Sequence, residues 1–471
     1  MKKIRTICLI LCCVLLLTPM RVSAQGQRVD QSVENGCHSV DAKMQLSDEG
    51  KLTDTAKAVI VYELGSDTMI YTWNPDEKIY PSSMVKLMTA LIALEKGQLT
   101  DRVVVTKRAL SHVAIGSVSA GLVAGEELSL EDLLYCLMAP SANDAATVIA
   151  EHIGGSQDGF VKLMNQRAQE LGCLSTNYTN AHGLHDSEMY TTARDICRLM
   201  DAALENPEFK KMFCAESYTV PATNKSEARE VYTSNYMMST HTVKKYYDPR
   251  VTGGKTGATD EAGRCLVATS EGKGMELLTI VMGAQPTYEP DGLSLKAFGS
   301  FEETKILLDH AMEKYEYRQI FYEGQTVSQH PVEGGTNDVA TKPEKTASTV
   351  LPVDIDVNKL NWIYGDNIGT LTAPIAKGQV ISVIQVWYGS KCLAQTNLVA
   401  ANAVDVWKAP VIPDRNHSGS DGSWETTVIL LAVFVGIVLV VAAAVFFRGR
   451  ILFMLDEARR RRRRKNRRRS R

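Results

Sequence analysis

The chain lacks the cysteine and histidine spacings that create metal sites or a regular disulfide pattern. Three of its 10 cysteines precede residue 25, and the other seven are scattered. An odd number of dispersed cysteines gives no disulfide framework. No CxxC pair and no paired histidines accompany them, so the sequence indicates no zinc site. We expect no metal and no other cofactor, and we expect most cysteines to be small core residues.

The central part of the chain also lacks an excess of basic residues. The formal net charge is −2, but without residues 1–24 and 448–471 only 35 basic residues remain against 52 acidic ones. An acidic body disfavours nucleic acid and anionic lipid as its partners. The arginine-rich tail alone could bind nucleic acid, although a role in membrane topology and in contacting anionic headgroups is the simpler interpretation.

Two uncharged apolar runs lie near the ends of the chain. The first, residues 7–17, follows basic residues and precedes Val22-Ser23-Ala24, a layout typical of a secretory signal peptide over residues 1–24. The second, residues 426–447, would span about 33 Å as a helix, enough for a bilayer core of roughly 30 Å. A buried core helix is the alternative, but the run has no polar face.

The basic tail sets the predicted topology. Residues 448–471 contain 13 Lys and Arg residues, which favours a cytoplasmic location for this tail. Residues 25–51 are expected to form a flexible lead and residues 408–425 a linker. The body would then lie outside a cell membrane that the chain crosses once. The sequence does not indicate an oligomeric state.

Strand patterns at both ends of residues 52–317 enclose a helical middle. Apolar runs at 58–62 and 69–73, and again at 264–269 and 275–282, flank short turns and predict two hairpins. Helical patterns cover residues 83–97, 129–138, 144–153, 160–171, 193–204 and 301–315. This order predicts an α/β (α+β) domain, with the terminal segments in one antiparallel sheet beside a helical cluster.

Residues 320–407 have a different character. Glycines punctuate short apolar runs such as residues 380–388, which predicts a small all-β domain. The segment has too few repeats for a propeller or a solenoid.

A serine and a lysine three residues apart begin the first expected helix. In Ser83-Met84-Val85-Lys86, helical spacing places the Lys86 amine beside the Ser83 hydroxyl. Ser83 could then act as a nucleophile and Lys86 as its general base. Taken alone, this common spacing is better explained by a helix cap followed by a surface lysine. As a base, Lys86 must be neutral, so its pKa must fall by about 3 units. Burial and a second cation, with Lys255 as the candidate, would produce that shift.

Ser141-Ala142-Asn143 falls in a bend between two expected helices. Ser141 could relay a proton to a leaving amine, and Asn143 could hold either Lys86 or the substrate backbone through its amide. Capping of the following helix by these two side chains is an equally credible interpretation of the motif on its own.

Lys255-Thr256-Gly257 follows two glycines, and glycine beside an edge strand allows another backbone to approach. A peptide substrate could add there as a strand, with its terminal carboxylate near Lys255 and Thr256. The N-H groups of Ser83 and Ala258 could form an oxyanion hole. A plain β-turn is the alternative.

Together the three motifs resemble the active site of penicillin-binding proteins and serine β-lactamases. Their flanks, residues 81–89, 140–146 and 254–259, are similar to those of the low-molecular-mass D-alanyl-D-alanine carboxypeptidases. The similarity covers about residues 56–405. It implies a bacterial cell-wall enzyme in which the terminal D-alanine of a peptidoglycan pentapeptide stem leaves through an acyl-enzyme. β-Lactams would be ligands of the same serine.

Carried over residue by residue, the resemblance implies two sets of roles. The catalytic residues would be Ser83, Lys86 and Ser141, and the substrate-binding residues would be Asn143, Lys255, Thr256, Gly257 and Ala258. The chain departs from its relatives at Met189, where many have histidine, and at Ser300, where an arginine often opens the helix. It also ends in an expected spanning helix, whereas relatives commonly end in an amphipathic one.

Two other functions remain open from the sequence. A β-lactamase of class A would carry a deacylating glutamate in an ExxLN-like loop, which Glu170-Leu171-Gly172-Cys173 does not match. A weakly catalytic wall-binding or morphology protein would keep the fold alone. Hydrolysis and transpeptidation, the stem-peptide preference and a vegetative or sporulation role are not distinguished.

Overall fold

The computed structural model describes residues 46, 49–240, 243–291, 295–356, 360–365, 369–389, 391–409 and 431–435. The described residues up to Trp407 belong to one compact unit, and a second unit starts at Lys408, where residues 431–435 are helical. The expected signal peptide, the basic tail, and most of the lead and of the apolar run at 426–447 lie outside these residues. Within them, no helix has the length and apolarity needed to cross a bilayer.

The centre of the fold is an antiparallel sheet with strand order β2-β1-β9-β8-β7. Its strands are β1 (Ala58–Glu63), β2 (Thr68–Trp73), β7 (Val251–Thr259), β8 (Gly263–Gly272) and β9 (Met275–Ala284). In the register between β1 and β9, Ile60 lies opposite Ile280. The prediction that two hairpins distant in sequence share one sheet is therefore confirmed, and β7 forms an edge of that sheet.

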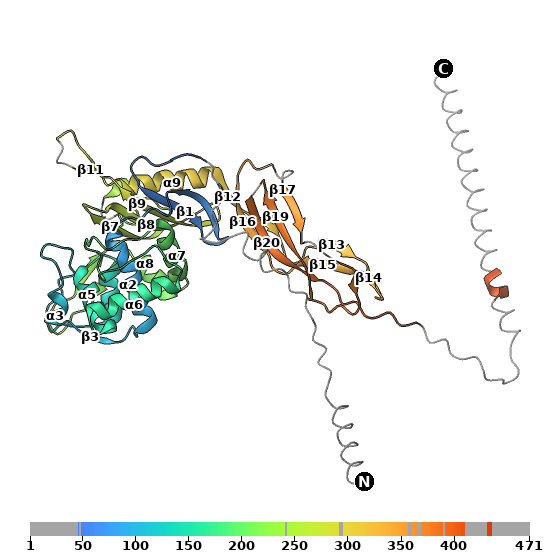
Figure 1. Ribbon diagram of the computed structural model, residues 1–471, viewed down its shortest axis with the longest axis horizontal. Coiled ribbons are helices and arrows are strands. Elements are labelled where there is room, and N and C mark those ends of the chain that lie inside the picture. Colours follow the sequence, from blue (N-terminus) through green and yellow to red (C-terminus); the bar gives the residue numbers. More distant parts are fainter. Residues whose placement is uncertain are drawn as a thin grey trace, which may run out of the picture. The chain divides into compact units, whose positions relative to one another are not determined.

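Helices cover both faces of this sheet (Figure 1). One face packs on α9 (Ser300–Lys314), and the other on a helical cluster. The cluster contains α2 (Val85–Lys96), α4 (Leu130–Met138), α5 (Asn143–Gly154), α6 (Gln157–Glu170), α7 (Ala193–Leu204) and α8 (Pro207–Phe213). Alternate β1 residues serve the two cores, because successive side chains of a strand point to opposite faces: Ile60 faces the cluster, whereas Val61 faces α9.

Several short elements were not predicted. They are a 3-10 turn η1 (Ser82–Met84), α3 (Lys107–Leu110), α8, and the strand pairs β3 (Arg102–Val104) with β4 (Glu127–Ser129), β5 (Ser217–Val220) with β6 (Arg229–Tyr232), and β10 (Thr287–Tyr288) with β11 (Leu295–Ala297). Strands of two to four residues give too little alternation for a sequence pattern to detect. The β5–β6 hairpin nevertheless proves important for the site.

The chain after α9 is rich in β-structure, as expected. β12 (Tyr315–Phe321) pairs with β16 (Ala347–Pro352), and β14 (Val332–Glu333) pairs with β18 (Leu371–Thr372). A second five-stranded sheet has the order β13-β15-β20-β19-β17. Its strands are Ser328–His330, Val339–Pro343, Lys391–Ala400, Val380–Tyr388 and Leu360–Tyr364 in that order. Small apolar clusters of its own stabilise this part.

The cysteines differ from the expectation at one position. Cys392 is disulfide-bonded. At least one disulfide bond is therefore present, although the number of cysteines after residue 24 is odd. The free cysteines of the described residues are Cys136, Cys173, Cys197, Cys214 and Cys265. All but Cys214 are buried, in agreement with small core residues. No metal-binding cluster of histidine, cysteine or carboxylate side chains occurs in the part of the chain that the structure describes.

Candidate active site

Ser83 lies in the turn η1 that opens α2, at the point where strand β7 passes. The preceding residue, Ser82, has a left-handed backbone (φ 49°), which is a strained conformation for a residue with a side chain. A Cβ at Gly257 would lie 3.2 Å from the Ser83 amide nitrogen. The glycine therefore allows β7 to approach the nucleophile candidate closely, and it places Ala258, which is exposed, next along the strand.

The Lys86 amine is completely buried and touches three oxygens. Its Nζ lies 2.7 Å from Asn143 Oδ1, 2.5 Å from the His182 carbonyl oxygen and 3.1 Å from Ser83 Oγ. A neutral amine has two N-H donors and one lone pair. Because the amide and carbonyl oxygens can only accept, they take both N-H groups, and the lone pair is left for the Ser83 hydroxyl hydrogen.

The pKa of Lys86 is well below the usual lysine value. Burial is the largest cause, and the charge of Lys255 lowers the pKa further, while the charge of Asp144 opposes the shift. The two causes expected from the sequence, burial and a second lysine, are both present in the structure. A buried amine with a depressed pKa is suited to accept a proton.

Lys255 is the second buried lysine of the site. Its Nζ donates to Ser141 Oγ at 2.7 Å and to the Thr256 carbonyl oxygen at 3.0 Å. Burial lowers the pKa of Lys255 to about 7. Ser141 also has a left-handed backbone (φ 69°), so its hydroxyl reaches Lys255 from a strained bend.

Asn143 and Ser141 do not cap α5, because its N-cap residue is Ala142 and no side chain makes a cap hydrogen bond there. Asn143 instead accepts from Lys86, and its backbone N-H donates to the Val118 carbonyl at 2.8 Å. The next residue, Asp144, accepts from Ser119 Oγ and from two backbone N-H groups of the same loop. The loop before β4 is thereby fixed to the second motif.

Sequence reasoning missed His182 and Gly183, which form the wall behind Ser83. The His182 carbonyl binds Lys86, and its imidazole Nδ1 accepts from the Leu184 N-H at 3.1 Å. Gly183 has φ +85°, and a Cβ there would lie 2.0 Å from the Ser82 carbonyl oxygen. Only glycine both adopts this positive φ readily and has no Cβ that would clash there. The residue pair His-Gly is common in sequence, so it gave no signal without the fold.

Gly183→Ala should destabilise the protein by about 3 kcal/mol, because left-handed strain adds to a clash with backbone atoms that no side-chain rotation relieves. Gly155→Ala is the matched control: its φ is +69°, but no atom lies within 4 Å of its Cβ. The control should lose only about 1 to 2 kcal/mol. Denaturant unfolding of both variants checks this, and equal losses would contradict the close approach.

The His182 side chain should make the fold sensitive to mild acid. Burial, then the charges of Lys86 and His112, lowers its pKa to about 4. Between pH 6.5 and 4 the unfolded chain binds a proton that the folded chain does not, so stability falls as the pH falls, by up to about 1.4 kcal/mol per pH unit. His182→Asn keeps an acceptor for the Leu184 N-H, and it should make the unfolding free energy less dependent on pH between 6.5 and 4. Between pH 7 and 8 the difference in unfolding free energy between the wild type and His182→Asn should stay constant.

Ser234, which follows the β5–β6 hairpin, is a further residue that the sequence did not indicate. Its Oγ lies 2.5 Å from Thr256 Oγ1, and its N-H donates to the Ala139 carbonyl at 2.9 Å. It therefore links the segment before Ser141 to the strand that carries Lys255. Polar tetrads such as Thr-Ser-Asn-Tyr are typical of loops, and only the fold reveals this contact.

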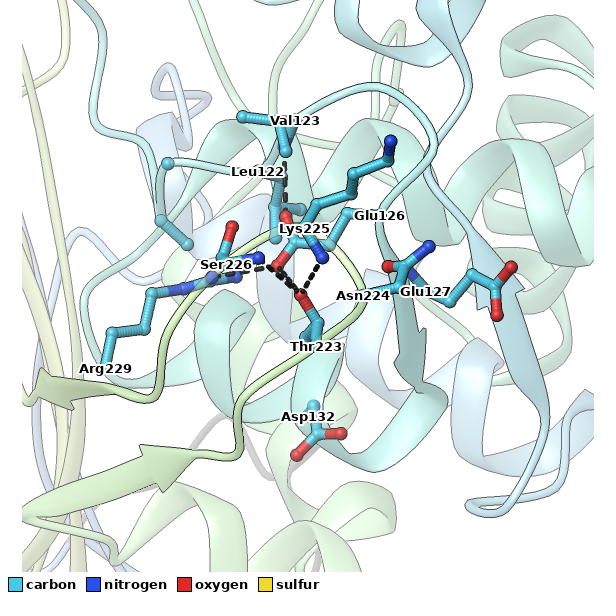
Figure 2. A network of polar contacts seen from close by, with 12 residues as sticks. Leu122, Val123, Glu126, Glu127, Asp132, Thr223, Asn224, Lys225, Ser226 and Arg229 are labelled. Atoms are coloured by element: carbon cyan, nitrogen blue, oxygen red, sulfur yellow. Dashed lines mark hydrogen bonds and ion pairs between the residues drawn. The ribbon is translucent and has the colours of Figure 1, made fainter.

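A buried carboxylate holds the β5–β6 hairpin in place. Figure 2 shows Glu126, Thr223 and Arg229 pointing toward one another. Glu126 is fully buried and accepts from Thr223 Oγ1 at 3.1 Å and from Arg229 Nη1 at 2.8 Å, and its second oxygen accepts from the Val123 N-H. The loop before β4, already fixed by Asp144, is thus joined to the hairpin that leads to Ser234.

Met189 and Ser300, the two positions expected from the sequence to depart from the family pattern, are both buried. Met189 is buried in the core beside the helical cluster. Ser300 is buried in the first turn of α9, where its carbonyl accepts from Thr304 Oγ1 at 2.7 Å.

The fold and the two buried lysines define a penicillin-binding-protein type of transpeptidase domain followed by a β-rich domain. The sequence matches the D-alanyl-D-alanine carboxypeptidase family, peptidase S11, over residues 44–286. It also matches the penicillin-binding protein 5 C-terminal domain over residues 315–406. The chain belongs to this family of serine D-Ala-D-Ala carboxypeptidases. The family binds peptidoglycan stem peptides and β-lactams.

Individual relatives are similar to this chain over most of its length. D-alanyl-D-alanine carboxypeptidase DacF of Bacillus subtilis is 29% identical over 371 residues, which cover 77% of this chain and 89% of that protein. DacC of Escherichia coli is 29% identical over 360 residues, covering 74% and 84%. The crystal structure of penicillin binding protein 5 from Haemophilus influenzae has a TM-score of 0.61 at 28% identity and covers 76% of this chain and 99% of its own.

Proposed function

We propose that this chain removes the terminal D-alanine from peptidoglycan pentapeptide stems through an acyl-enzyme on Ser83. The observation that carries the proposal is the arrangement around Lys86. Two of its three partners can only accept hydrogen bonds, so a neutral amine directs its lone pair to Ser83 Oγ, 3.1 Å away.

In this mechanism, Lys86 takes the hydroxyl proton as Ser83 attacks the carbonyl carbon of the penultimate D-alanine. The N-H groups of Ser83 and Ala258 receive the developing oxyanion. Ser141 passes a proton to the leaving D-alanine, and water then hydrolyses the ester to release the shortened stem. β-Lactams would acylate Ser83 in the same way.

The substrate would bind along β7, whose outer edge is unpaired in the described sheet. An extended peptide can add to such an edge through backbone hydrogen bonds. Its terminal carboxylate would then meet the Thr256 hydroxyl and the Lys255 charge. Gly257 allows the same strand to pass close to Ser83.

A β-lactamase is less well supported. A deacylating glutamate must reach the water that attacks the ester, whereas Glu170 lies on the surface at the end of α6. There it accepts from Gln166 at 2.9 Å and pairs with Arg167. A weakly catalytic wall-binding protein would not require two lysines to be buried beside a serine, since each burial is unfavourable for folding.

We also propose that the body, with a catalytic domain at 52–317 and a β-rich domain at 320–407, acts outside the bacterial cell membrane. A signal peptide would export it, and the run at 426–447 would anchor it, with the basic tail inside. This part of the proposal rests on the sequence pattern. The acidic body disfavours nucleic acid as a partner.

The test uses the full chain in detergent, incubated separately with benzylpenicillin and with a pentapeptide ending in D-Ala-D-Ala. Protein mass reports a penicillin adduct, and an amino-acid assay reports released D-alanine. A lasting adduct together with D-alanine release supports the carboxypeptidase. Rapid penicillin turnover would support the β-lactamase, and neither activity would support the wall-binding protein.

A further inference from the structure

Ser234 and Thr256 place two hydroxyl groups side by side on the wall of the site that carries Lys255. Their oxygens are 2.5 Å apart, and both residues are only half-buried. In such a pair one hydroxyl donates to the other, so one hydrogen remains for an outside acceptor. The pair is therefore polar, accessible and able to donate more than it does in the free protein.

The backbone holds Ser234 firmly in this position. Its N-H is bound to the Ala139 carbonyl, two residues before Ser141. The next residue, Asn235, is fully buried; its Oδ1 accepts from the Met237 N-H, and a Cβ at Gly254 would lie 2.2 Å from its Nδ2. Ser234 is thus fixed between the bend that carries Ser141 and the strand that carries Thr256.

A carboxylate suits this pair better than a neutral group. Both hydroxyls can donate to its two oxygens, so one neutral hydrogen bond is exchanged for two charge-assisted ones. Lys255 lies beside the pair, because its Nζ donates to the Thr256 carbonyl and to Ser141 Oγ, and its protonated form adds a positive charge there. No other described residue is hydrogen-bonded to the Thr256 hydroxyl.

We propose that Ser234 binds the C-terminal carboxylate of the substrate, with its hydroxyl and the Thr256 hydroxyl each donating a hydrogen bond to that carboxylate. The proposal rests on the proposed carboxypeptidase function and deepens it. Ser234 is then a specificity residue: it distinguishes a free terminal carboxylate from an amide or an extended chain.

The experiment compares Ser234→Ala with the wild-type full chain on two substrates, a pentapeptide ending in D-Ala-D-Ala and the same peptide with a C-terminal amide. Loss of a hydrogen bond to a charged group should lower kcat/KM for the acid by about ten- to a hundred-fold. Release from the amide, which lacks the negative charge, should change less than about three-fold. The main effect for the acid should be on KM. Ser234→Thr keeps the hydroxyl and should restore at least part of the preference for the acid.

Thr219→Ala is the matched control, because Thr219 is exposed on β5 of the same hairpin; it should affect neither substrate. If Ser234→Ala lowers kcat/KM equally for the acid and the amide, the proposal is overturned, and Ser234 only links the hairpin to the strand. No effect on either substrate would also overturn it. A wild-type protein that releases D-alanine from neither substrate would instead refute the proposed function, which keeps the two failures distinguishable.

Discussion

Ser83→Ala is expected to form no covalent adduct with benzylpenicillin and to release no measurable D-alanine. The methyl group has no electron pair with which to attack a carbonyl carbon. The fold should survive, because the hydrogen-bond partner of Ser83 Oγ in the structure is Lys86, which retains its bonds to Asn143 and to the His182 carbonyl. Intact-protein mass and a denaturant curve measure both outcomes.

Ser82→Ala is the matched control for that experiment. Ser82 is adjacent in sequence and buried, and its Oγ has no hydrogen-bond partner among the described residues. Alanine there keeps the left-handed backbone and should leave adduct formation within a few-fold of the wild type. An adduct that persists in Ser83→Ala, or disappears in Ser82→Ala, would show that Ser83 is not the nucleophile.

The longer helices and the two hairpins of the central sheet could be predicted because short-range signals specify them. The turn Gly65-Ser66-Asp67 between two apolar runs predicted the hairpin of β1 and β2. The helical pattern at residues 129–138 predicted α4, which starts with a capping box of Ser129 and Asp132. The shared sheet could also be predicted, since strands on either side of a helical segment have few other strands with which to pair.

The site could be predicted only where its residues fall in recognisable motifs. Ser83 and Lys86 are one helical turn apart, so their contact is local. The contact from Lys86 to the His182 carbonyl joins residues 96 positions apart, and it involves a backbone oxygen that no side-chain pattern can reveal. Ser234 reaches Thr256 across a loop after a hairpin too short to detect. The Cys392 disulfide was missed for a related reason, since cysteine counts do not specify pairing.

Lys86→Met is expected to lower the acylation rate with benzylpenicillin by about a thousand-fold. Methionine fills similar volume but accepts no proton, and general-base catalysis typically contributes about 10²- to 10⁴-fold. Stopped-flow or quenched mass measurements at saturating penicillin give this rate. Lys96→Met, an exposed position in the last turn of the same helix, should acylate as the wild type does.

The same variant tests whether the Lys86 amine is neutral in the folded protein. Its folded pKa lies below the unfolded value of about 10.5, so between the two values the unfolded chain binds a proton that the folded chain does not. Stability from this group is therefore fully present above pH 10.5 and is lost as the pH falls, by about 1.4 kcal/mol per pH unit. As the pH rises towards 10.5, the gain in unfolding free energy should be smaller in Lys86→Met than in Lys96→Met, by up to that amount per unit. Parallel curves would mean that Lys86 is charged in both states, and a charged Lys86 could not act as the base.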